Sequence, residues 1–219
     1  DRETGEFLWA RQTIYQNVIA DINTESGAAT VDPSQLFTRV GQELSVCPAQ
    51  TGGKNYPAGT YSPRTGVMYY PLQNTCMTTT AQSDERDPDA LYAISMRSRL
   101  APNQENVGTL QAINVQTGAL EWKREQPAGT LSLISTGGGL LFGGDVNGRF
   151  RAYDEDNGDI LWEVNLGAPV NGYPATFAVD GRQYVAISTG PSGLVFGLAA
   201  LAGIAPGSGN RLYVFALPE

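Results

Sequence analysis

Residues Ala152 to Trp162 read Ala-Tyr-Asp-Glu-Asp-Asn-Gly-Asp-Ile-Leu-Trp, and this stretch decides the fold. A strand ends near its first Asp, an Asn-Gly pair allows a turn with a positive φ, and a second strand carries the Trp. The pattern recurs from Ala112 to Trp122, and its last part recurs from Asp1 to Trp9. Asn114 and Asp154 hold the same place in two copies and stand 40 residues apart, the length of a four-stranded propeller blade. The repeat predicts an all-β fold, a β-propeller.

The first copy of the repeat begins at its Asp, which is residue 1, without the strand that precedes the turn in the other copies. The sequence also has no initiator Met and no apolar signal segment. We therefore expect residues 1–219 to be the C-terminal part of one β-propeller domain that belongs to a longer polypeptide.

The composition is typical of a soluble, extracytoplasmic all-β protein. Charged residues make up 16% of the chain, and 26 Gly and 13 Pro suit many short strands joined by tight turns. A net charge of −8 without a Lys/Arg cluster argues against nucleic-acid binding. The apolar run from Leu194 to Ile204 is too short to span a membrane and is interrupted by Gly. The chain has no His, so any metal or general-base chemistry would need carboxylates.

Strands can be placed along the second half of the chain from alternating apolar residues and turn signals. The segment from Leu131 to Asn165 holds four of them, a nearly complete blade. Residues 166–219 supply about three strands, and we expect the fourth to come from the other end of a circular propeller. One short helical turn is predicted near Asp32, which can cap a helix that begins with Pro33. The strands are predicted at 108–115, 119–124, 131–135, 140–144, 149–153, 160–165, 173–179, 183–188 and 211–217.

Residues 15–107 are predicted to be less regular, with long loops at Ser83 to Asp89 and at Arg97 to Val107. Long loops on a rigid repeat scaffold commonly carry function. The region contains Cys47 and Cys76, which favour a disulfide in an exported chain over two buried thiols. Closing this loop stabilises a fold by about 3 to 4 kcal/mol in the chain-entropy model.

Several short segments then carry a specific resemblance: Cys47-Pro48, Gly52-Gly53-Lys54-Asn55, Tyr61-Ser62-Pro63 and Gln183-Tyr184-Val185-Ala186-Ile187. With the Trp-bearing repeats, they resemble the C-terminal half of the quinoprotein methanol/ethanol dehydrogenases, over essentially all 219 residues. The resemblance implies a partial propeller with Trp-docking repeats, about four blades of an eight-bladed ring that holds pyrroloquinoline quinone (PQQ) and calcium on its axis. The insert that places an Asn after the first Cys and a second Cys 29 residues after it is the strongest of these features.

The resemblance implies that Asn55 lies against the quinone. An amide offers both donors and acceptors, which suits a ligand edged with carbonyls and carboxylates. Tyr56 would line the same cavity, and Lys54 would help to neutralise the anionic cofactor. The alternatives are that Asn55 only satisfies the backbone of its loop and that Lys54 is simply exposed.

Two positions depart from the pattern of these relatives. A Trp that stands beside the quinone in the family falls on or near Thr130, so Thr130 takes its place as a candidate cofactor contact. The Gly-Gly-Trp of the methanol-oxidising relatives is replaced by the stretch from Thr189 to Leu194, which has no aromatic residue. Both changes indicate a roomier cavity and a substrate larger than methanol.

The Trp residues of the repeat are interpreted as packing groups and not as cofactor contacts. Trp9, Trp122 and Trp162 stand at equivalent positions, as contacts between neighbouring blades require. Each ring is expected to find a partner for its N–H on the next blade. Asn114 and Asp154 are interpreted as turn formers.

The activity implied by the resemblance is the periplasmic oxidation of an alcohol or aldehyde by hydride transfer to PQQ, assisted by calcium. The family's calcium ligands and catalytic Asp lie in its N-terminal half, so no catalytic or metal-binding residue is assigned here. The implied partners are the N-terminal portion as a companion chain and a cytochrome c electron acceptor. Two alternatives stay open: a noncatalytic propeller like the outer-membrane assembly lipoproteins, and a quinoprotein that oxidises sugars or polyols.

Overall fold

A computed structural model describes residues 1–83 and 93–216. The predicted loop from Ser83 to Asp89 therefore lies almost wholly outside the described residues, as does Leu217 at the end of the last predicted strand. The chain divides into two compact units. One contains Asp1–Gly53 and Asn74–Gln104, and the other contains Lys54–Gln73 and Glu105–Glu219. We call them unit 1 and unit 2.

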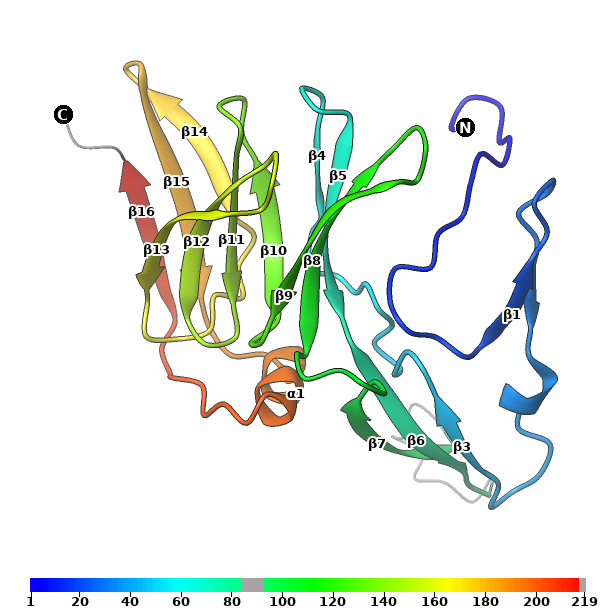
Figure 1. Cartoon of the computed structure of the whole chain (residues 1–219). Helices are drawn as coiled ribbons and strands as arrows, with labels where there is room; N and C mark the ends of the chain where they lie inside the picture. Colours follow the sequence, from blue (N-terminus) through cyan, green and yellow to red (C-terminus); the bar gives the residue numbers. More distant parts are fainter. Residues whose placement is uncertain (84–92, 217–219) are drawn as a thin grey trace. The chain divides into compact units, whose positions relative to one another are not determined.

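Unit 2 is built from three antiparallel sheets (Figure 1). In the last two, neighbouring strands follow one another in the chain, as in propeller blades, whereas the two halves of the first sheet are separated in the chain by strands of unit 1. The blade predicted between residues 131 and 165 is confirmed as a four-stranded sheet. The strands are β4 (Thr60–Ser62), β5 (Val67–Gln73), β8 (Gly108–Asn114) and β9 (Leu120–Gln126) in one sheet, β10 (Thr130–Ser135), β11 (Leu140–Asp145), β12 (Arg149–Asp154) and β13 (Ile160–Asn165) in the next, and β14 (Ala175–Val179), β15 (Arg182–Thr189) and β16 (Arg211–Ala216) in the third.

The repeated turn has the same hydrogen bonds in each copy. At Asp154, Oδ1 accepts from the N–H of Asp156 at 2.8 Å, and the backbone carbonyl accepts from Gly158, which has φ of 77°. Asn114 and Asp1 build the same turn, which confirms them as turn formers. Two further copies of the turn are not followed by a Trp, so the repeat pattern read from the sequence did not include them. The copy from Asn23 to Gly27 makes both kinds of bond, and for the copy from Ser62 to Gly66 the structure shows the backbone bond.

Trp122 joins the first two sheets of unit 2, as the repeat predicts. Its indole N–H donates to the backbone carbonyl of Glu155 at 2.9 Å, and the hydroxyl of Tyr69 donates to the same oxygen at 3.0 Å. The ring lies against Gly158, where an added Cβ would approach it to 2.7 Å. Tyr69 and Trp122 belong to an apolar core shared by the two sheets, so the docking of a Trp onto the next turn is confirmed for this pair.

Trp162 occupies the equivalent place on the second sheet. It packs on Phe150 and Phe215, with ring centroids 6.1 and 5.3 Å away, and is 40% exposed. Phe150 and Phe215 belong to the core between the second and third sheets.

A helix that the sequence analysis did not predict, α1 (Gly193–Leu201), follows β15. Its sequence contains two Gly, no charged side chain and apolar residues on every side, so no helical periodicity stands out. Ser192 caps it by accepting from the N–H of Val195. Packing decides its conformation, because Val195, Leu198 and Ala199 are buried with Ala128, Leu131 and Val146.

Unit 1 contains more regular structure than the sequence suggests. The predicted loop from Arg97 to Val107 is wrong in its first part, since β7 (Ile94–Leu100) pairs along its whole length with β6 (Thr75–Ala81). β7 is an edge strand, and its Arg and Ser residues resemble a loop in sequence although an edge strand tolerates them. The predicted turn at Asp32 is confirmed as a short 3₁₀ helix. The other strands of unit 1 are β1 (Ile19–Ile22), β2 (Ala29–Val31) and β3 (Glu43–Val46).

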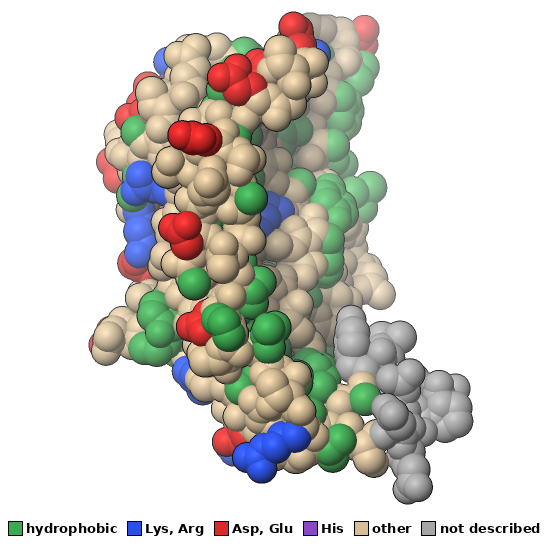
Figure 2. Space-filling model, turned by 90° about the vertical axis from the view of Figure 1, so that its right-hand side faces the viewer, with side chains coloured by type: hydrophobic (Ala, Val, Ile, Leu, Met, Phe, Trp, Pro, Cys, Tyr) green, Lys and Arg blue, Asp and Glu red, His purple; other side chains and the backbone are tan. Residues whose placement is uncertain are grey.

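Charged and apolar side chains are mixed on the surface. On the face drawn in Figure 2, acidic and basic groups lie scattered among hydrophobic ones. At the edge of the third sheet of unit 2, Leu212 and Val214 of β16 are 71% and 51% exposed.

Candidate functional site

The candidate site is the loop from Lys54 to Ala58, which precedes β4 in unit 2. The Lys54 ammonium donates to the backbone carbonyls of Asn55, at 2.7 Å, and of Pro57. Partial burial lowers the pKa of Lys54 below its ordinary value. Lys54 therefore braces its own loop, and its predicted role in neutralising a cofactor stays a prediction.

Asn55 follows in the loop and is half-buried. Its Oδ1 accepts a hydrogen bond from the N–H of Tyr56 at 2.7 Å. The carboxamide oxygen thus satisfies loop backbone, which is the alternative raised for this residue. Its predicted contact with a cofactor stays a prediction.

Tyr56 is tethered to two distant segments of unit 2. Its hydroxyl lies 3.3 Å from the hydroxyl of Ser192, the residue that caps α1. Its backbone carbonyl accepts a hydrogen bond from the hydroxyl of Tyr173 at 3.3 Å. Both rings remain open to solvent, with Tyr56 49% and Tyr173 58% exposed. Sequence reasoning found Tyr56 but missed Tyr173 and Ser192, which no local motif marks.

The end of the loop is fixed to β10. The N–H of Ala58 donates to the hydroxyl of buried Ser132 at 3.0 Å, and the N–H of Leu133 donates to the carbonyl of Ala58 at 2.9 Å. Gly59 has no room for a side chain, because a Cβ would come within 2.8 Å of the Tyr69 carbonyl. The loop is therefore held from both sides.

Thr130 lies on the same strand as Ser132 but is buried within the blade. It pairs with Asp145 of β11, and its side chain is close to the hydroxyl of Tyr153. Burial raises the pKa of Tyr153, and nearby Arg151 opposes that rise. The structure thus surrounds Thr130 with groups of its own blade. Its role at a cofactor stays a prediction.

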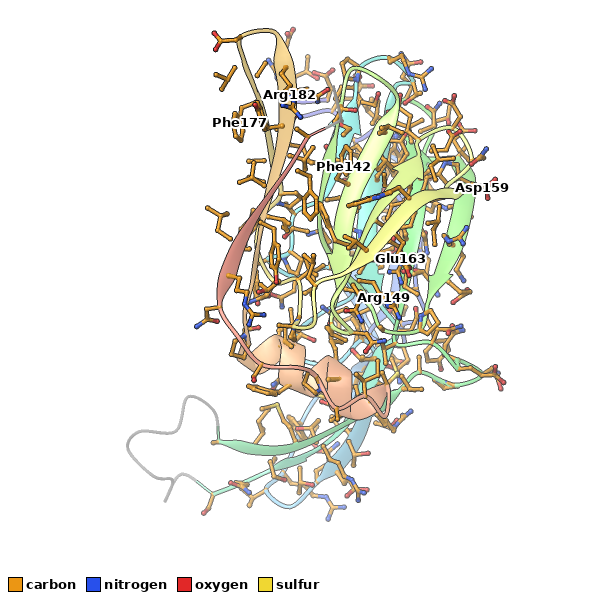
Figure 3. All side chains as sticks on the ribbon, turned by 90° about the vertical axis from the view of Figure 1, so that its left-hand side faces the viewer. Phe142, Arg149, Asp159, Glu163, Phe177 and Arg182 are labelled. Atoms are coloured by element: carbon orange, nitrogen blue, oxygen red, sulfur yellow. A yellow bond between two sulfur atoms is a disulfide. The ribbon has the colours of Figure 1, made fainter. Side chains whose placement is uncertain are left out.

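The charged side chains of this blade pair with one another. Arg151 donates to Asp145 and to Glu163, at 2.6 Å in both cases, and Asp145 is almost fully buried. Arg149 and Glu163 lie side by side on the outer part of the blade (Figure 3), with N and O 3.1 Å apart. At the turn end, Arg64 bonds buried Glu155 and exposed Asp156. Over residues 1–83 and 93–216, no three His, Cys, Asp or Glu side chains come together as a metal site.

The predicted disulfide is present in unit 1. Cys47 and Cys76 are bonded and fully buried together with Ala101. Asn17 holds the first of them, since its Oδ1 accepts from the N–H of Cys47 at 2.7 Å and its own N–H donates to the Cys47 carbonyl at 3.0 Å. No helix in the described part of the chain is long and apolar enough to cross a membrane.

Comparisons with known proteins agree on one group. The PQQ family described as glucose/ethanol/alcohol dehydrogenase, β-propeller domain, matches residues 89–185. The dehydrogenase subunit of a quinone alcohol dehydrogenase from Gluconacetobacter polyoxogenes is 30% identical over 216 residues, which is 92% of this chain and 29% of the relative. A lanthanide-dependent methanol dehydrogenase from Methylacidiphilum fumariolicum is 29% identical, over 94% of this chain and 34% of the relative. The chain thus spans about a third of the length of these relatives.

Solved structures of methanol and alcohol dehydrogenases also superpose on this chain. A europium-containing methanol dehydrogenase superposes with a TM-score of 0.85 at 27% identity, over 99% of this chain and 42% of the other. The quinohemoprotein alcohol dehydrogenase from Comamonas testosteroni superposes with a TM-score of 0.82 at 25% identity, over 99% of this chain and 33% of the other. The arrangement of sheets and loops described above is therefore that of a quinoprotein propeller.

Proposed function

Because the chain belongs to the quinoprotein alcohol dehydrogenase family of β-propellers, we propose that it is part of a PQQ-dependent enzyme that oxidises an alcohol or aldehyde. The observation that supports this most directly is the similarity to named relatives along almost the whole chain. Relatives named as quinone alcohol dehydrogenases and methanol dehydrogenases cover more than nine-tenths of the chain. Neither alternative from the sequence, a noncatalytic scaffold or a sugar oxidase, gains similar support.

The donor set of the loop fits a quinone that bears carbonyls and carboxylates. We propose that Asn55, whose oxygen accepts from the Tyr56 backbone, turns carboxamide N–H donors to the ligand, since hydrogen-bond donors suit an oxygen-rich, anionic molecule. Two anchors hold this amide in place, the Tyr56 backbone on one side and the Ala58 to Ser132 bond on the other. A preorganised donor loses little entropy when the ligand binds.

A bound PQQ with its metal ion supplies the hydride acceptor for alcohol oxidation. This chain's share is to bind and orient. Asn55 holds the edge of the cofactor with its N–H donors, and the loop from Lys54 to Ala58 keeps that amide fixed. We assign no base or metal ligand to the described residues, and we expect those groups in the part of the polypeptide outside this segment.

The surroundings of the enzyme are part of the proposal. We propose calcium or a lanthanide as the metal, since one relative is named lanthanide-dependent. A cytochrome c is proposed as the electron acceptor, because the names of some relatives include cytochrome c. The periplasm is proposed as the location, with the rest of the propeller as the companion of this segment.

Reconstitution tests the function. The full polypeptide that contains this segment is purified without cofactor and loaded with PQQ and either Ca²⁺ or a lanthanide, and alcohol-dependent reduction of a dye is followed. We expect turnover of primary alcohols that requires both PQQ and the metal. A protein that shows the spectrum of bound quinone yet oxidises no alcohol and no aldehyde would disprove the proposed activity.

A further inference from the structure

Tyr56 and Tyr173 form a tethered aromatic pair next to Asn55. The Tyr173 hydroxyl donates to the Tyr56 carbonyl, and the Tyr56 hydroxyl contacts the cap of α1 at Ser192. Their polar ends are thus engaged with protein. About half of each side chain is nevertheless exposed, 49% for Tyr56 and 58% for Tyr173. The part left open is therefore mostly ring carbon, which is an apolar surface.

The three segments that meet at this pair carry no charge. Residues 55–63, 164–179 and 183–210 contain no Asp, Glu, Lys or Arg. Lys54, which precedes Asn55, has its ammonium on the carbonyls of its own loop. Phe196 stands one helical turn after Ser192, on the same side of α1, and is 57% exposed. The segments that carry the pair thus offer exposed aromatic rings and no charged side chains.

We propose that the rings of Tyr56 and Tyr173 form the wall on which the carbon chain of the substrate packs, so that the enzyme prefers primary alcohols with a long alkyl or an aryl chain. The inference rests on the proposed function and names its substrate class. An uncharged aromatic wall gains free energy by burying CH₂ groups and aromatic rings. It offers few partners to the several hydroxyls of a polyol, each of which costs free energy when it is desolvated without a hydrogen bond.

The hydrogen bonds that hold the two Tyr hydroxyls favour binding of a long alcohol over a short one. A free Tyr would lose rotamer entropy when a substrate packs on it, whereas a ring already held by its hydroxyl loses less. Methanol has no chain to bury on such a wall and gains nothing from it. The ratio of kcat/KM for a long alcohol to that for a short one therefore reports on the wall directly.

The test uses the full polypeptide loaded with PQQ and metal, and equal quinone content is checked by absorbance in every variant. Values of kcat/KM are measured for methanol, ethanol, 1-hexanol, benzyl alcohol and glycerol. We expect 1-hexanol and benzyl alcohol to be the best substrates and glycerol the poorest. Tyr173→Ser and Tyr56→Ser should lower the ratio of hexanol to ethanol about tenfold, as the loss of apolar contact predicts. Tyr173→Phe keeps the ring and should lower that ratio less.

Tyr61→Ser is the matched control. Tyr61 is 48% exposed, but its carbonyl bonds Ser135, at the opposite end of β10 from Thr130, so the ratio should stay as in the unmodified protein. Saturation-transfer NMR of 1-hexanol on the loaded protein detects the contact between the alcohol and the protein in a preparation without turnover. This measurement separates the inference about the aromatic wall from the proposed activity. Equal preference for methanol or glycerol, or a hexanol signal unchanged in both Ser variants, would overturn the proposal.

Discussion

At the scale of single residues, the carboxamide of Asn55 has one observed role and one proposed role. Its oxygen accepts from the N–H of Tyr56 and shapes the loop, while its N–H donors are proposed to bind the quinone. The two roles can be separated by substitution. An Asp at this position keeps an oxygen for Tyr56 but replaces the donors by a negative charge, which repels an anionic cofactor.

We expect both Asn55→Ala and Asn55→Asp to weaken PQQ binding by the full polypeptide, at a cost of about 1 to 3 kcal/mol for a lost hydrogen bond to a buried partner. Titration of the cofactor-free protein with PQQ, followed by quinone absorbance, gives the dissociation constant. The melting temperature of the cofactor-free Asn55→Asp variant should stay close to that of the unmodified protein. Normal affinity in the Asp variant would show that the amide N–H groups do not bind the quinone.

The disulfide acts at the same scale, in unit 1. Cys47 and Cys76 close a loop over a separation of 29 residues, so replacing both by Ala should destabilise the fold by about 3 to 4 kcal/mol. The unfolding midpoint of the oxidised protein with and without a reductant measures the effect. The Cys47→Ala/Cys76→Ala variant should then show no change with reductant, and a midpoint equal to that of the oxidised parent would contradict the expectation.

At the scale of elements, the turn of the repeat does two things at once. Gly158 has a positive φ, which costs free energy in a residue with a Cβ. Its missing side chain also leaves space for the ring of Trp122. Gly66 holds the same place in another copy of the turn, with φ of 68°, and an added Cβ would have no atom within 4 Å. The two glycines thus differ mainly in the docked ring.

Gly66→Ala should cost about 1 to 2 kcal/mol, which is the price of a left-handed conformation in a residue with a Cβ. Gly158→Ala should cost about 1 to 3 kcal/mol more, because the methyl group displaces the Trp122 ring. Unfolding midpoints of the full polypeptide measure both variants. If the two substitutions cost the same, the ring does not depend on the glycine for its place.

At the scale of the whole molecule, the 219 residues leave large apolar side chains uncovered. In unit 2 these include Leu161, Leu212 and Val214, which are 58%, 71% and 51% exposed. β16 also forms one edge of its sheet, with unpaired backbone groups along it. A strand with these features pairs readily with another chain.

We therefore expect these residues, expressed alone, to self-associate, and to become soluble when the rest of the propeller is supplied as a second chain. Analytical ultracentrifugation and native mass spectrometry measure both states. Lys at positions 212 and 214 (Leu212→Lys/Val214→Lys) should reduce the association of the isolated segment, since charge on an edge strand opposes pairing. A cooperative melt from a monomer of 23.4 kDa would contradict the expectation.

The sequence by itself determined the repeated turn and the complete blade of unit 2. Turn chemistry and strand periodicity are local properties, so the turns at Asn114 and Asp154 and the blade from β10 to β13 could be predicted from neighbouring residues alone. The role of Trp122 followed as well, because a repeat must bury its face on the next one. Cysteine content and the expected compartment were enough to predict the pair Cys47–Cys76.

Only the tertiary structure decided the elements and the site that depend on distant partners. α1 forms because Val195 and Leu198 find an apolar patch from β10 and its neighbours, although its own sequence has no helical pattern. β7 forms because β6 pairs with it residue by residue. The site combines Tyr56 with Tyr173, 117 residues away in the sequence. No local pattern records such a contact, because its free energy exists only once the chain has folded.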